Sequence, residues 1–210
     1  MDDVPETGSE AIRLEALWRG DFGDDYVDRN AGGYELREAF WNDLFDTIGF
    51  QSVLEVGCNV GGNLRWLVPL LRSGASFGID VNTKAIARLH AEVPGVNAIS
   101  GPGRDLPFRD RWFDLVFTMG VLIHQPDSTL PLVMSEMVRT SARWVFMGEY
   151  FAEETTEVHY RGHDSALFKR DYGAIFAELF PDWVQADSGF LSRDAGWDDV
   201  TWWLFERRNR

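Results

Sequence analysis

The stretch Ser52-Val-Leu-Glu-Val-Gly-Cys-Asn-Val-Gly-Gly-Asn63 decides the fold. A short apolar run reaches the acid Glu55, turns at Gly57 and Gly61, and leads into the apolar segment 64–71. This order predicts a strand, a tight loop and a helix. Glycines let a ligand approach the main chain closely, and the first turn of a helix offers unpaired N–H groups. The stretch therefore predicts a cofactor-binding loop, with a purely structural turn as the alternative.

A second apolar run, residues 75–80, ends at Asp80, about 20 residues beyond Gly61. An acid at the tip of the neighbouring parallel strand is placed to accept hydrogen bonds from both hydroxyls of a ribose. The loop and this acid together indicate a nucleoside-containing cofactor.

The details of the loop discriminate between two such cofactors. Loops that bind nicotinamide dinucleotides read G-x-G-x-x-G and place a helix N-terminus against a pyrophosphate. Residues 55–61 read Glu-Val-Gly-Cys-Asn-Val-Gly instead, which resembles the E/D-x-G-x-G-x-G pattern of class I S-adenosylmethionine-dependent methyltransferases. Asn59 replaces the middle glycine, and Asn tolerates left-handed backbone geometry. An acid at the strand tip also suits an ammonium or a sulfonium better than a pyrophosphate, so the loop favours S-adenosylmethionine, with S-adenosylhomocysteine as product.

This resemblance implies an α/β fold: a Rossmann-like, mostly parallel sheet of seven strands in the order 3-2-1-4-5-7-6, with helices on both faces. Periodicity predicts helices at 33–49, 64–71, 82–92, 128–141 and 171–180, and strands at 96–100, 113–117, 143–147, 183–191 and 199–207. Residues 1–32 are interpreted as a leader and cap, with a weakly ordered start (1–10), a short helix (11–18) and a turn-rich stretch (19–30). Residues 33–210 form one methyltransferase domain, with a lid segment at 149–170.

The predicted cofactor site combines the loop pattern with positions implied by the resemblance. Tyr26 and Arg29 are expected to cover the cofactor and clamp its carboxylate. Pro102 stands where many relatives have an acid for the adenine amino group, so Asp105 or the backbone near Leu106 is expected to replace it. The full set is Tyr26, Arg29, Glu55, Gly57, Asn59, Gly61, Asp80, Val81, Asp105, Leu106 and Met119.

Catalytic and substrate-binding candidates come from the end of the fourth strand and from the lid segment. His124 is predicted to act as a general base, because imidazole titrates near neutral pH, or else to orient a loop carbonyl. Glu149 and Tyr150 are further catalytic candidates. The substrate candidates are His159, Tyr160, Arg161, His163 and Arg170. No metal site is expected, since histidines four residues apart share a face only on a helix, which Gly162 opposes.

Composition limits the partners and the location. The 210 residues carry a formal net charge of −14, which argues against a nucleic-acid partner, although solubility alone also explains an acidic surface. The single cysteine, Cys58, excludes an internal disulfide, is interpreted as a small packed residue, and fits a reducing cytoplasm. No signal peptide or bilayer-length apolar run is visible, so no membrane association is expected. A monomer and a homodimer both remain open.

A narrower resemblance covers nearly the whole chain. Residues 18–30, 160–163 and 167–171 look like the pseudaminic acid biosynthesis-associated methylases. The resemblance implies methyl transfer to a nitrogen, oxygen or carboxylate of a small polar metabolite, such as an acidic sugar or another secondary metabolite. The alternatives are a nicotinamide-dependent oxidoreductase and a non-catalytic S-adenosylmethionine-binding regulator.

Overall fold

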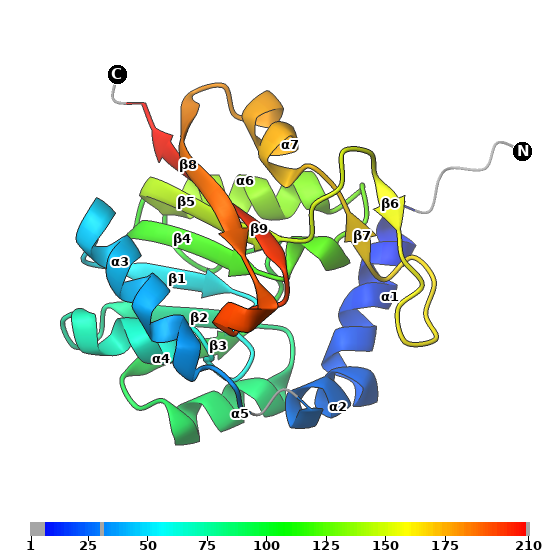
Figure 1. The fold of residues 1–210 in the computed structure, drawn as a ribbon. Coiled ribbons are helices and arrows are strands. Elements are labelled where there is room, and N and C mark those ends of the chain that lie inside the picture. Colours follow the sequence, from blue (N-terminus) through cyan, green and yellow to red (C-terminus); the bar gives the residue numbers. More distant parts are fainter. Residues whose placement is uncertain (1–6, 30–31, 209–210) are drawn as a thin grey trace, which may run out of the picture.

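The computed structural model describes residues 7–29 and 32–208. Its main sheet has seven strands in the order β3-β2-β1-β4-β5-β9-β8 (Figure 1). The first five strands are parallel to one another, β9 runs antiparallel to β5, and β8 runs antiparallel to β9. The strands are β1 (Val53–Val56), β2 (Ser76–Asp80), β3 (Val96–Ser100), β4 (Phe113–Met119), β5 (Ser141–Glu149), β8 (Trp183–Leu191) and β9 (Val200–Arg207).

The predicted Rossmann-like α/β sheet is present, and its strand numbering needs one correction. The lid segment contributes two short strands, β6 (Thr156–Glu157) and β7 (Phe168–Lys169), which pair antiparallel in a separate two-stranded sheet. Short strands with little periodicity give no clear sequence pattern. The expected order 3-2-1-4-5-7-6 omitted these strands, and the observed order is 3-2-1-4-5-9-8.

Helices cover both faces of the sheet (Figure 1). Successive residues of a strand point to opposite faces: Val53 packs in one core with Trp41, and Leu54 packs in the other with Met134. The first core is covered by α3 (Glu38–Ile48), α4 (Leu64–Leu67) and α5 (Thr83–Glu92), and the second by α6 (Leu130–Thr140) and α7 (Tyr172–Leu179). Short 3-10 turns are η1 (Glu35–Arg37), η2 (Val68–Leu70), η3 (Leu122–His124) and η4 (Arg193–Ala195).

Two of the predicted helices are shorter than expected. The segment 64–71 divides into α4 and η2, because Pro69 lacks the N–H that an α-helix interior requires. The helix expected over 33–49 begins as η1 at Glu35 and continues as α3.

The N-terminal prediction was also partly wrong, because two helices form there: α1 (Thr7–Arg19) and α2 (Asp21–Arg29). Thr7–Glu10 belongs to α1 and not to a weakly ordered leader, and residues 1–6 lie outside the described residues. The stretch read as turns is α2, with acids in its first turn and Arg29 in its last, as the helix dipole favours. A Cβ on Gly23 would lie 1.8 Å from the Trp18 carbonyl oxygen, so this glycine allows the close packing of the two helices.

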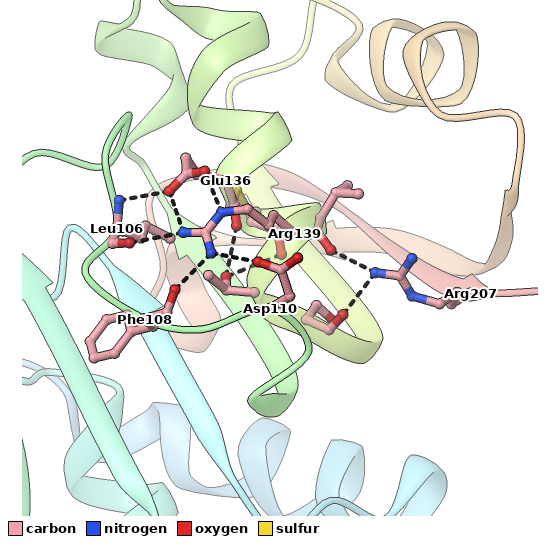
Figure 2. A network of polar contacts seen from close by, with 10 residues as sticks. Leu106, Phe108, Asp110, Glu136, Arg139 and Arg207 are labelled. Carbon is pink, nitrogen blue, oxygen red and sulfur yellow. Dashed lines mark hydrogen bonds and ion pairs between the residues drawn. The ribbon is translucent and has the colours of Figure 1, made fainter.

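A polar network fixes the long loop between β3 and β4 against α6 (Figure 2). Arg139 of α6 donates to the carbonyl oxygens of Leu106 (2.8 Å) and Phe108 (2.7 Å) and forms ion pairs with Glu136 and Asp110. Glu136 in turn accepts the backbone N–H of Leu106 at 2.7 Å. The guanidinium of Arg139 therefore satisfies two backbone carbonyl groups of this loop.

Arg139→Met should lower the free energy of unfolding by about 2 kcal/mol, because hydrogen bonds to charged groups contribute about this much and their partners would be left unsatisfied. Denaturant unfolding measures the change. Arg143→Met is the control: Arg143 pairs with Glu206 on the exposed surface, and we expect a loss of less than about 1 kcal/mol. Equal losses in the two variants would contradict the role assigned to Arg139.

Candidate active site

A cavity of about 310 Å³ opens at the carboxyl ends of the parallel strands, where ligands bind in open α/β sheets. Its walls come from the loop after β1, the tips of β2 and β4, and the two N-terminal helices. Three further segments complete it, at 101–104, 120–126 and 160–161, together with the loop 197–200. The cavity thus joins segments from both ends of the chain.

The glycine loop is held to the end of β2 by three hydrogen bonds. The Ile79 carbonyl oxygen accepts the N–H groups of Gly57 (2.8 Å) and Cys58 (3.1 Å). Asp80 accepts the N–H of Asn59 at 2.9 Å, and its other oxygen accepts the N–H of Asn82 at 2.9 Å. Asn59 has a φ of 44°, the left-handed geometry for which Asn is suited. Asp80 therefore lies beside the loop, and both line the cavity.

The two outer glycines of the loop differ in their surroundings. Gly57 lines the cavity with φ 75°, and a Cβ there would lie 2.3 Å from Val121. Gly61 also has φ 75° but faces Leu89 of α5 and does not line the cavity. Gly61 thus lets the loop pack closely against α5 before the chain enters α4, and its cofactor contact stays a prediction. Cys58 is buried against Gly78, as expected for a small packed residue.

Glu55 is a buried acid at the base of the cavity. One carboxylate oxygen accepts the side-chain N–H of Asn63 at 2.6 Å, and the other has no hydrogen-bond partner among the described residues. Burial raises the pKa of Glu55 to about 8, against the lowering effects of Asn63 and Arg37. A cationic or N–H-donating ligand group would satisfy the unpartnered oxygen.

The two residues predicted to contact adenine, Asp105 and Leu106, lie outside the cavity lining, and the contact stays a prediction. Asp105 is exposed. The backbone of Leu106 is engaged by Glu136 and Arg139, as described above. The cavity wall in this region is formed by residues 101–104, and Arg104 pairs with Glu15 of α1 through two hydrogen bonds.

The N-terminal helices cover the cavity. Trp18 and Tyr26 line it, as do Ala11, Leu14 and Glu15 of α1. Asn82 attaches the helices by donating to the Trp18 carbonyl oxygen (3.1 Å) and to Asp24 (2.8 Å). Arg29 is exposed on α2 and does not line the cavity, so the structure does not bring it together with the other predicted cofactor residues, and its carboxylate clamp stays a prediction.

His124 is buried in η3 and lines the cavity. Its Nδ1 donates to the Ala166 carbonyl oxygen at 2.6 Å, because a carbonyl can only accept. This bond makes Nε2 the unprotonated nitrogen of the neutral ring, and Nε2 has no hydrogen-bond partner among the described residues. Burial lowers the pKa of His124 to about 4, so the ring stays neutral near pH 7.

Glu149 and Tyr150 adjoin each other in sequence but differ in their roles. Glu149 is fully buried, lies outside the cavity lining, and accepts the backbone N–H groups of Val121 (3.3 Å) and Ile123 (3.2 Å). Glu149 thus holds the turn that carries His124, and its catalytic role stays a prediction. Tyr150 lines the cavity and donates its hydroxyl to Asp198 at 2.9 Å.

The lid segment contributes two of its five predicted substrate residues to the cavity, Tyr160 and Arg161. His159 is exposed and bonds Asp164 at 2.6 Å, whereas the ring of His163 packs 5.0 Å from that of Phe22. His159 thus contacts another residue of the lid segment, His163 contacts α2, and neither histidine lines the cavity.

Arg170, predicted to bind the substrate, lies apart from Tyr160 and Arg161 in the structure, and its substrate contact stays a prediction. It is 2 % exposed, lies outside the cavity lining, and donates to the Gln125 carbonyl oxygen (2.9 Å) and to Asp127 (2.8 Å). Its hydrogen bonds join β7 to the turn before α6.

Several lining residues were not predicted from the sequence. Val81 and Met119 were expected and line the cavity, whereas Tyr34, Arg37, Asn63, Trp197 and Asp198 were missed. Asn63 stands eight residues after Glu55, at a position where an amide side chain can reach back, which is the one local signal available. The others approach only through tertiary packing.

No group of three or more His, Cys, Asp or Glu side chains in the described ranges could hold a metal ion. In the same part of the chain, no helix is both long and apolar enough to cross a bilayer.

The comparisons with known proteins agree with this geometry. Residues 53–143 match the family model described as "Methyltransferase domain". A fatty-acid O-methyltransferase of Mycolicibacterium smegmatis is 36% identical over 33% of this chain and 26% of its own length. The 24-methylenesterol C-methyltransferase 2 of Arabidopsis thaliana is 30% identical over 59% of this chain and 37% of its own length. The chain thus spans about a quarter to two fifths of the length of these curated relatives.

Solved structures extend the likeness of the fold to the whole chain. The 1,6-didemethyltoxoflavin-N1-methyltransferase of Burkholderia thailandensis, with bound 1,6-didemethyltoxoflavin and S-adenosylhomocysteine, has a TM-score of 0.73 at 15% identity and covers 100% of this chain and 93% of its own. The magnesium protoporphyrin IX methyltransferase of Synechocystis, with bound S-adenosylhomocysteine, has a TM-score of 0.70 at 15% identity over 94% and 100%. The predicted Rossmann-like α/β fold is confirmed, and the matches support the predicted enzyme class.

The buried acids make the stability of the ligand-free chain depend on pH. Burial raises the pKa of Glu55 to about 8 and that of Glu149 to about 7, both above the ordinary value of 4.5. The folded chain therefore binds more protons than the unfolded chain in this range, so their contribution is complete below about pH 4.5 and is lost as pH rises towards 8.

The free energy of unfolding should fall between pH 5.5 and pH 8.5, and it should fall less in Glu55→Gln than in the unchanged chain. The difference should be at least about 1.4 kcal/mol, the equivalent of one pKa unit. Urea unfolding at the two pH values measures it. Glu178→Gln, on the exposed surface of α7, should leave the pH dependence as it is. A Glu55→Gln variant with the original pH dependence would contradict the buried ionisable state.

Proposed function

We propose that this protein transfers a methyl group from S-adenosylmethionine to a nitrogen, oxygen or carboxylate of a small polar molecule. The donor, when bound, supplies a methyl group already activated by a positive sulfur. The chain then has to hold the acceptor in line with the methyl carbon, exclude water, and accept a proton where the acceptor carries one.

The observation that carries this proposal is the pair of acids beside the glycine loop. Asp80 lines the cavity while its carboxylate holds the loop, at a place suited to ribose hydroxyls. Glu55 presents a buried and unpartnered oxygen, which suits the ammonium group of the donor's amino acid end. Gly57, Asn59, Val81 and Met119 complete the proposed cofactor set, with Tyr26 as a cover from α2.

The same acids bear on the two rival functions. A nicotinamide-dependent oxidoreductase would bring a pyrophosphate close to the Asp80 carboxylate, which repels it. A non-catalytic regulator would bind the donor without turnover, so the two are distinguished by assay.

His124 is proposed as the residue that contacts the acceptor. Its tautomer is fixed by Ala166, so Nε2 can accept a hydrogen bond or a proton from an acceptor in the cavity. Tyr150, Tyr160 and Arg161 are proposed to bind the acceptor, with 149–170 as the lid segment and the N-terminal residues as the cap of one methyltransferase domain.

The acidic sugar suggested by the narrower resemblance stays one candidate acceptor. Its support is limited to Arg161, because Arg170 and Lys169 lie outside the cavity lining. A cytoplasmic location, the lack of a nucleic-acid partner, and the open choice between monomer and homodimer also stay predictions.

Asp80→Ala should weaken binding of S-adenosylmethionine by well over tenfold, because it removes two carboxylate oxygens from the cofactor wall. Titration calorimetry measures the affinity, and circular dichroism checks the fold. Asp105→Ala is the matched control, since Asp105 lies outside the cavity, and its affinity should stay unchanged. Unchanged affinity in Asp80→Ala would remove the main support for the cofactor.

His124→Ala should lower turnover by about a hundredfold, typical of a lost general base, while the affinity for S-adenosylmethionine changes less than threefold. Labelled donor incubated with a metabolite extract provides the activity, and calorimetry provides the affinity. His159→Ala, on the exposed part of the lid segment, should keep both. Full activity in His124→Ala would reduce His124 to a structural residue.

A further inference from the structure

A second cluster of polar side chains lies in the cavity, apart from the cofactor acids. Tyr26 of α2, Tyr150 at the end of β5, Tyr160 of the lid segment and Asp198 before β9 all line it. The pKa of Tyr150 is raised first by burial and then by the neighbouring Asp198 carboxylate. The pKa of Tyr26 is also raised, first by burial and then by neighbours that include Tyr160 and Asp198. The four side chains therefore form one group, assembled from four separate segments.

The walls around this group are aromatic. The ring of Trp18 lies 4.5 Å from that of His124 and 5.3 Å from that of Tyr26, and His124 lies 5.5 Å from Tyr160. Aromatic faces attract cations and pack against the hydrocarbon next to them. The Asp198 carboxylate lines the same cavity and accepts the Tyr150 hydroxyl, and a carboxylate is suited to a positively charged or N–H-rich group.

Of the three arginines that line the cavity, Arg37 and Arg104 are already engaged. Arg104 is held by Glu15. Arg37 donates to the Gly196 carbonyl oxygen (3.0 Å) and to Asn63 (3.2 Å), and it lies over the rings of Tyr34 and Trp197. Arg161 is exposed. An anionic acceptor would therefore find little compensation inside the cavity.

The open groups in this part of the cavity are hydrogen-bond acceptors. Asp198 is exposed at the edge of the cavity, where it accepts one bond from Tyr150 and lies 3.8 Å from the exposed Arg193 guanidinium, and its carboxylate retains further lone pairs. His124 presents an unprotonated Nε2, because its Nδ1 proton is used by Ala166. A ligand that matches them must supply N–H donors.

We propose that the acceptor of the methyl group is an amine nitrogen, held by Asp198 and by Nε2 of His124 between the aromatic side chains. This inference rests on the proposed methyl transfer and specifies its acceptor. An amine that enters as an ammonium ion first releases a proton to water. The nitrogen lone pair then forms a bond to the methyl carbon as the carbon–sulfur bond breaks, and that electron pair stays on sulfur. The resulting methylammonium carries the positive charge lost by sulfur.

The test uses the full chain saturated with S-adenosylhomocysteine, whose binding is first measured by calorimetry. Two matched sets of probes differ only in the functional group: 2-phenylethylamine, 2-phenylethanol and phenylacetate, and glucosamine, glucose and glucuronate. We expect the amine of at least one set to raise the melting temperature more than its alcohol and carboxylate partners. Asp198→Asn should weaken the apparent affinity for that amine about tenfold. Asp194→Asn, on the exposed turn η4 and outside the cavity, should leave it unchanged.

The outcomes separate the two proposals. Failure to bind S-adenosylhomocysteine overturns the proposed methyl transfer itself. If it binds and, in both probe sets, the alcohol or the carboxylate stabilises the protein as much as the amine does, the amine inference is overturned and the methyl transfer stands. Labelled product from a metabolite extract gives an independent readout: an N-methyl product supports the inference, and a methyl ester or ether overturns it.

Discussion

The hydrogen bonds between the glycine loop and the end of β2 determine the form of the cavity. Parallel pairing of β1 with β2 places Val56 beside Ile79, so the chain leaves both strands at the same edge of the sheet. The Ile79 carbonyl oxygen and the Asp80 carboxylate then fix three consecutive N–H groups of the loop. The loop turns away at this point, and the cavity lies between it, the tip of β4 and the covering helices. Asp80 and Glu55, which line the cavity, are held in place by hydrogen bonds within the chain itself.

This arrangement has a cost in stability. Glu55, Asp80 and Glu149 are acids whose pKa is raised by burial, and a buried charge disfavours folding unless it is compensated. Glu149 is offset by the backbone N–H groups of the turn that carries His124, whereas one oxygen of Glu55 has no such offset among the described residues. A ligand with a positive charge near Glu55 would supply the missing compensation. The free energy that this buried acid costs the folded chain would then be regained when the ligand binds.

The features that the sequence predicted correctly are those encoded locally. The glycine loop, the placing of Asp80 beside it and the left-handed Asn59 all follow from a few neighbouring residues. The surroundings of Leu106 were not predicted: its backbone is bonded to Glu136 and Arg139 (Figure 2), about 30 residues further on. Arg170 is likewise paired with a turn more than 40 residues away. Such side-chain pairings depend on tertiary packing, which periodicity does not record.

The two ends of the cavity rest on different parts of the chain. The cofactor end is built from the tips of β1 and β2 and from the loop 101–104, all within the stretch 53–143 that matches the methyltransferase domain model. The acceptor end is built mainly from α1, α2, the lid segment and the loop before β9, all outside that stretch. Substitutions at the acceptor end therefore need not disturb the sheet or the glycine loop. The relatives that match part of this chain carry names as different as a fatty-acid and a sterol methyltransferase, and the part of the cavity lined by Tyr150, Tyr160 and Asp198 lies outside the stretch that the family model matches.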